Sequence, residues 1–167
     1  MATPEQQPHV LAGVRSGVSD RYARFYAPLA IGSTAVAFLP LFDDVVVRDG
    51  DGKVEHTTRY GTVFDMAGRS GGEPAVFGLL LLGVLVAALT YASFRARGAL
   101  VPVMIAACAG LIALMLVTKP GTGTPTPPLS DAGVAGLVLA LCALALGVAH
   151  AVHLSMLHRR PEGPAAQ

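Results

Sequence analysis

Four long stretches without a charged residue constrain this chain more than any other feature. They cover residues 25–42, 75–94, 98–117 and 132–149, and the last pattern continues as helix to about residue 153. An α-helix rises about 1.5 Å per residue, so about 20 apolar residues cross a hydrocarbon core of about 30 Å. A helix also satisfies its own backbone groups in lipid, which excludes strands here. The sequence therefore predicts an all-α integral membrane protein, a four-transmembrane-helix antiparallel bundle.

The composition excludes several classes of protein. Of the 167 residues, 53% are hydrophobic and 14% are charged. Soluble domains carry about a quarter charged residues, so a soluble enzyme and a nucleic-acid-binding protein with a basic surface are both excluded. The four stretches are apolar on all faces, and they therefore lack the solvated side that a water-soluble helical bundle needs.

The spans divide the chain into an N-terminal segment 1–24, a membrane domain 25–155 and a tail 156–167. The first span follows a mostly polar segment and has no small-residue cleavage site beyond it, so we interpret it as a membrane helix rather than a cleaved signal peptide. Ser19 is the predicted N-cap of the first helix, Pro74 lies in the first turn of the second, and Ser130 with Asp131 caps the fourth.

Charge asymmetry between the loops predicts the orientation. Segments 1–24, 95–97 and 156–167 carry seven basic and three acidic residues, whereas loops 43–74 and 118–131 carry five basic and eight acidic residues. Short loops rich in Lys and Arg stay in the cytoplasm. We therefore expect a multi-pass protein of the cell membrane with both termini cytoplasmic. Ten Arg against two Lys, with abundant Ala and Gly, is typical of a high-GC bacterial genome.

The first outer loop predicts a small β-hairpin over residues 45–60. A run of three valines at 45–47 precedes an Asp-Gly-Asp-Gly turn at 49–52, and an alternating segment returns after it. The turn does not fit a calcium-binding loop of the EF-hand type, because Lys53 and Val54 stand where a third oxygen ligand and a glycine are needed. A two-stranded ribbon is marginal alone, so we expect it to lean on the bundle or on a partner.

After the hairpin, residues 62–65 have the spacing of a capping box, with Asp65 in place of the usual Glu. This predicts a short helix that holds Phe64 and Met66 against the membrane interface and ends at Gly68; an irregular loop is the alternative. The second outer loop is rich in Pro, Thr and Gly at 119–128 and predicts an extended, polyproline-like linker, with O-linked glycosylation as a further hypothesis.

Two pairs of side chains are candidates for chemistry. His150 and His153 are three residues apart and share a helix face near the cytoplasmic boundary, with His158 in the tail. Cys108 and Cys142 lie near the middle of consecutive antiparallel helices. A metal or haem site needs more ligands than the spans offer, and neither thiol has a charged neighbour. We therefore expect interfacial histidines, packing cysteines and no cofactor.

The membrane interior carries no ionisable Asp, Glu, Lys or Arg, which are the residues that mark proton relays and coupled transport pathways. It does carry small residues at four-residue spacing, which let helix backbones approach closely. The predicted helix-packing positions are Gly110, Gly136 and Gly147.

We therefore expect a non-catalytic accessory or structural subunit. Its partners are the lipid bilayer and either another membrane protein or a second copy of the chain, without nucleic acid. The alternative is a small metal- or redox-binding membrane protein that uses His150 with His153, or Cys108 with Cys142.

Overall fold

The computed structural model describes residues 7–95, 98–123 and 125–158 and is mostly helical. Three of its helices are long and apolar enough to cross a membrane: α3 (Glu73–Arg95), α4 (Leu100–Thr118) and α5 (Asp131–His158). These correspond to the second, third and fourth predicted spans, and they support a membrane protein. Pro74 lies in the first turn of α3 as predicted, where a proline costs no internal hydrogen bond.

The first helix differs from its prediction at both ends. α1 spans Gln7–Val36, so Ser19 lies inside the helix rather than at its N-cap. The helix also stops six residues before the end of the apolar stretch 25–42. Pro40 explains this, because a proline ring clashes with the carbonyl group four residues earlier, which is that of Val36. Residues 37–39 form only tight turns, in which each backbone N–H donates to the carbonyl three residues earlier. The described structure therefore has three candidate spans by length and composition, and a fourth is not established.

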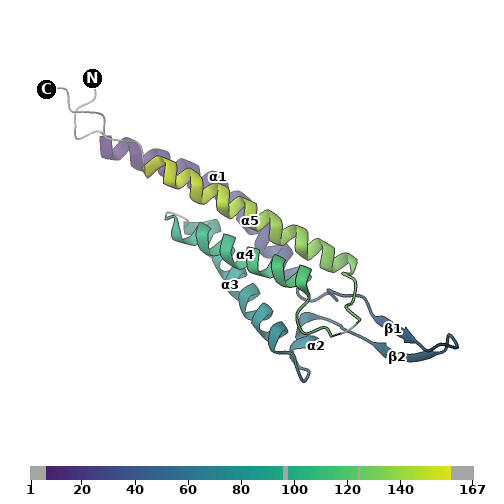
Figure 1. Cartoon of the computed structure of the whole chain (residues 1–167). Helices are drawn as coiled ribbons and strands as arrows, with labels where there is room; N and C mark the ends of the chain where they lie inside the picture. Colours follow the sequence, from purple (N-terminus) through teal and green to yellow (C-terminus); the bar gives the residue numbers. More distant parts are fainter. Residues whose placement is uncertain (1–6, 96–97, 124, 159–167) are drawn as a thin grey trace.

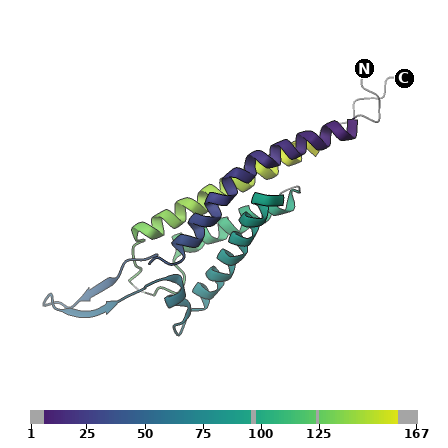
Figure 2. The same cartoon turned by 180° about the vertical axis from the view of Figure 1, so that it is seen from behind.

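The long helices pack side by side (Figures 1 and 2). α1 contacts α3 and α5, and α4 contacts α3 and α5, so each long helix packs against two of the other long helices. The start of α1 and the end of α5 lie together at one end, which we call the terminal end. The strands β1 (Val45–Arg48) and β2 (Val54–Thr58) and the short helix α2 (Val63–Ala67) lie at the opposite end, the hairpin end. At the terminal end, α1 and α5 extend beyond the end of α3 and the start of α4 (Figure 1).

The core consists of two separate clusters of buried side chains. The larger lies between the long helices and includes Tyr26, Leu85, Leu89 and Ile105, each at most 1% exposed. The smaller lies at the hairpin end and consists of Phe42, Tyr60 and Leu116. Many other apolar side chains of the long helices are exposed, for example Leu80 at 64% and Leu100 at 72%. Such exposure suits helices whose outer faces meet lipid.

Two loop segments pair across the hairpin end and connect α1 to α5. Phe42 forms an isolated antiparallel bridge with Leu129, and the Asp43 N–H donates to the carbonyl of Pro128 at 3.1 Å. The Ser130 hydroxyl accepts the Gly133 N–H at 3.0 Å, which confirms the predicted cap of α5, and it donates to the Pro40 carbonyl at 2.5 Å. One side chain therefore ties the end of α1 to the start of α5.

Gly147 lies where α5 closely approaches the α4 backbone. A Cβ atom at this position would lie 2.8 Å from the Pro102 carbonyl oxygen and 3.0 Å from the Ala106 nitrogen. Both atoms belong to the α4 backbone, which cannot move away as a flexible side chain could. Gly83 of α3 is the opposite case, because a Cβ there meets no atom within 4 Å.

We predict that Gly147→Ala destabilises the protein by about 1–3 kcal/mol, the usual effect of overpacking a well-packed contact. Gly83→Ala is the matched control, and it should leave stability unchanged or raise it by up to about 1 kcal/mol, because Ala is the better helix former. Thermal and denaturant unfolding in detergent micelles measure both. Equal stability of the two variants would contradict the close α4–α5 contact.

Candidate functional site

The β-hairpin is the most prominent feature outside the long helices, and the structure confirms its prediction. β1 and β2 pair antiparallel, with Val46 opposite Thr57 and Arg48 opposite Val54, and one bulge between Val47 and Arg48. The Asp49 carboxylate accepts the N–H groups of Asp51 and Lys53 at 2.9 and 3.2 Å. The side chain of Asp49 therefore closes the turn, as in an Asx-turn.

The hairpin stands apart from the helices. Among the named elements of the described chain, β1 and β2 contact only each other, and both cartoons show them projecting from the hairpin end (Figures 1 and 2). Of the ribbon, Val45 at its base packs on the cluster of Phe42, Tyr60 and Leu116, and the strands make no further element contact with the described helices; support by a partner stays a prediction. Residues opposite each other in an antiparallel pair point to the same face, so Val46, Arg48, Val54 and Thr57 share one face.

This face, which we call the valine face, is open to the surroundings. Val46 is 47% exposed and Val54 is 57% exposed, and Thr57 and Arg48 beside them are exposed as well. Two exposed β-branched side chains on a ribbon that no other element covers form a small surface suited to packing against another protein.

Polar contacts hold the base of the hairpin in place. The Arg59 guanidinium lies 3.8 Å from the Asp44 carboxylate at the surface. The Tyr60 hydroxyl donates to the Thr122 carbonyl at 2.9 Å, which joins the two loops of the hairpin end. The Arg69 guanidinium donates to the Arg59 carbonyl at 2.5 Å. The ribbon is therefore anchored where it leaves the helices and free beyond that point.

The short helix α2 forms as predicted, with both bonds of a capping box. The Asp65 N–H donates to the Thr62 hydroxyl oxygen at 3.2 Å, and the Thr62 N–H donates to the Asp65 carboxylate at 2.8 Å. The backbone N–H and then the hydroxyl of Thr62 hold the pKa of Asp65 below its ordinary value. The cap is therefore complete above the pKa of a free Asp, about 3.9, and weakens as the pH falls through the lower folded value.

The two predicted histidines meet α1 at the terminal end. His150 is fully buried, its ring stacks on Tyr22 with centroids 4.3 Å apart, and its Nδ1 forms a 2.8 Å hydrogen bond with the Tyr26 hydroxyl. Its Nε2 is buried and has no partner within the described residues. His153 is exposed and lies 3.5 Å from the Tyr22 hydroxyl, at the limit of a hydrogen bond.

The other predicted candidates are spread over α4 and α5. Cys108 is partly buried against the core and Cys142 is exposed, and both are free thiols. Gly136 packs near Val36 of α1, and Gly110 faces Leu144 of α5. The side chain of His158 lies outside the described residues.

Within the described part of the chain, no group of three or more His, Cys, Asp or Glu side chains could hold a metal ion. The metal- or redox-binding alternative therefore stays a hypothesis without a complete ligand set.

Sequence reasoning missed Tyr22 and Tyr26, which are the partners of His150. A usable signal was present, because the two tyrosines are four residues apart and so share one helix face. A buried tyrosine hydroxyl needs a partner, and the histidine pair of the last helix offers one. Their pairing across α1 and α5, which are distant in sequence, follows only from the fold.

Comparisons with protein-family models, with curated proteins and with solved structures gave no match.

We predict that Tyr26→Phe lowers stability by about 1–2 kcal/mol, because it leaves His150 Nδ1 buried without its partner. Tyr91→Phe is the matched control: Tyr91 is 53% exposed on α3, and its variant should stay within about 0.5 kcal/mol of the wild type. Unfolding in detergent followed by circular dichroism measures both. A Tyr26→Phe variant as stable as the Tyr91→Phe variant would show that the hydrogen bond carries no stability.

Proposed function

We propose that this protein is a non-catalytic membrane protein that presents its β-hairpin to a protein partner outside the membrane. One observation carries the proposal: β1 and β2 contact no other named element of the described chain, while their valine face is exposed. An isolated two-stranded ribbon is marginal in water. A partner that packs on the valine face would supply the burial that the helices do not.

The proposal includes the orientation of the chain in the cell membrane. α1 would cross as a fourth membrane helix together with the turn segment 37–42, since residues 25–42 are uncharged. The acidic hairpin end would then face the outside and the arginine-rich terminal end the cytoplasm. This orientation is what brings the hairpin within reach of an external partner.

The orientation is tested with single cysteines in a chain that lacks Cys108 and Cys142. We expect Lys53→Cys in the hairpin turn to react with a membrane-impermeant maleimide in intact cells, and Glu162→Cys in the tail to react only after lysis. The reverse pattern would contradict the orientation and with it the proposed partner.

Docking on the valine face is tested by site-specific photo-crosslinking in cells. We expect a crosslinker at Val54 to give a discrete adduct, and one at His56 to give none, because His56 is exposed on the same strand but lies on the other face. The mass of the adduct separates a second copy of the chain from a different protein. No adduct at Val54, or equal yields at Val54 and His56, would refute docking on this face.

A further inference from the structure

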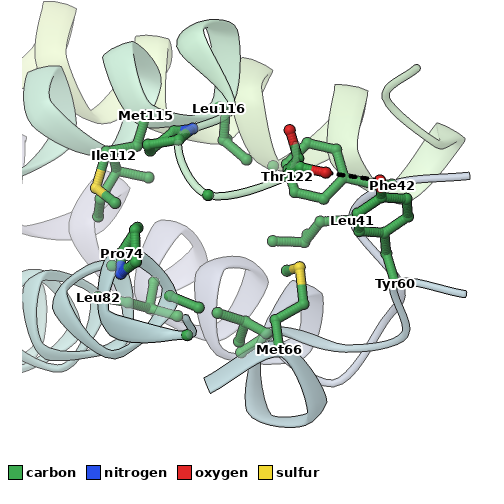
Figure 3. Close-up of a pocket in the computed structure, with 18 of the residues that line it drawn as sticks. Leu41, Phe42, Tyr60, Met66, Pro74, Leu82, Ile112, Met115, Leu116 and Thr122 are labelled. Carbon is green, nitrogen blue, oxygen red and sulfur yellow. Dashed lines mark hydrogen bonds between the residues drawn. The ribbon is translucent and has the colours of Figure 1, made fainter. Parts of the chain in front are cut away.

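A cavity of about 280 Å³ opens at the hairpin end and reaches down between the long helices. Figure 3 shows it between Leu41, Phe42, Tyr60 and Met66 on one side and Pro74, Leu82 and Met115 on the other. It lies between the two core clusters, since Leu85 of the larger cluster and Leu116 of the smaller both line it. An apolar cavity of about 150 Å³ already takes up benzene and stays free of water, so this one has room for a larger apolar group.

Small residues create the cavity. The helices α1, α3 and α5 each contribute at least one small residue to the lining of the cavity. The lining residues of α4 are long and apolar. The small lining residues are Ser33 of α1, Ala37 just after it, Ala75 and Gly78 of α3, and Gly136 and Ala140 of α5. Their side chains are too short to meet across the centre of the helices. Leu or Val at these positions would fill the space with the protein's own side chains.

The depth of the cavity matches one leaflet of a bilayer. Its lining on α3 runs from Pro74 at the start of the helix to Leu85. Eleven residues of helix rise about 16 Å, and half of a hydrocarbon core of about 30 Å is about 15 Å. With α3 across the membrane, the cavity therefore extends from the headgroup level to about the middle of the bilayer.

The lining of the cavity is apolar in its deeper part and polar at its mouth. The lining residues from the outer segments include Thr58, Arg69, Ser70 and Thr122, and Arg69 is the only charged residue of the lining within the described chain. The Arg69 side chain is exposed and uses one N–H in its bond to the Arg59 carbonyl. A guanidinium has five N–H donors and suits a phosphate group well.

We propose that this cavity binds one hydrocarbon chain of an anionic phospholipid from the leaflet on the hairpin side, with the phosphate headgroup at Arg69. The inference rests on membrane insertion of α3, α4 and α5, and it does not depend on the partner proposed for the hairpin. The surrounding bilayer supplies this occupant at high local concentration. An amphipathic lipid also matches the order of the lining, which is cationic at the mouth and apolar below it.

The chain-binding part is tested by native mass spectrometry of the full chain in mild detergent, after delipidation and titration with phosphatidylglycerol. Gly78→Leu places a side chain in the cavity, since an added Cβ there meets only the end of Met115, at 3.5 Å. Gly83→Leu is the matched control on the same helix, where an added Cβ meets nothing. We expect one retained lipid in the wild type and in Gly83→Leu, and at least tenfold weaker retention in Gly78→Leu.

The same variants separate lipid loss from misfolding. A filled cavity should raise the thermal stability of lipid-free Gly78→Leu above that of the lipid-free wild type, whereas a misfolded variant would be less stable. Ala75→Leu fills the same cavity from one turn away and replaces Gly78→Leu if that variant does not fold. A wild type that retains no lipid, or equal retention in folded Gly78→Leu and Gly83→Leu, would overturn the proposal.

The headgroup part is tested by comparing phosphatidylglycerol with phosphatidylcholine. We expect the wild type to prefer the anionic lipid at least fivefold and Arg69→Gln to lose this preference while still retaining lipid. Arg48→Gln on the hairpin, which does not line the cavity, should keep the preference. Equal affinity of the wild type for both lipids, or an unchanged preference in Arg69→Gln, would refute the assignment of the headgroup to Arg69.

Discussion

The pairing of the segment that follows α1 with the segment that precedes α5 determines the architecture of the hairpin end. Phe42 bridges to Leu129, and the Ser130 hydroxyl both caps α5 and donates to the Pro40 carbonyl. These contacts hold the segment after α1 against the start of α5. They also set the position from which the hairpin departs, and they hold Leu41 and Phe42 as one wall of the cavity. The exposed ribbon and the cavity beneath it therefore both start from this pairing.

Much of the fold could be predicted from local pattern. The apolar stretches gave α3, α4 and α5, the valine run and the Asp-Gly turn gave the hairpin, and the Thr62–Asp65 spacing gave α2. Each depends on residues close in sequence, where periodicity and capping rules apply directly. The end of α1 was misjudged because hydropathy alone extends the helix to residue 42, whereas Pro40 stops the hydrogen-bonding pattern at Val36.

The sites were less predictable because they depend on contacts between distant segments. The spacing of His150 and His153 was visible, but the stacking of Tyr22 on His150 requires α1 to lie beside α5. The small-residue pattern of the last helix was also visible, yet it does not show that Gly147 approaches the α4 backbone, nor that Gly136 packs on Val36 at the edge of a cavity. A small residue can mark either a close contact or an empty space, and only the arrangement of the neighbouring helices distinguishes the two.

The composition of the cavity wall has a consequence for biogenesis. Gly136, Leu139 and Ala140 of α5 form part of the lining, together with residues of α1, α3 and α4 that are synthesised earlier. Helices enter a membrane in the order of translation, so this wall is the last to arrive. With α3 and α4 in the membrane, the faces of these two helices that later line the cavity would be open to lipid until α5 docks. Docking of α5 therefore turns an open groove into a cavity that opens only at the hairpin end, and a lipid chain already lying in that groove would be held there as assembly is completed.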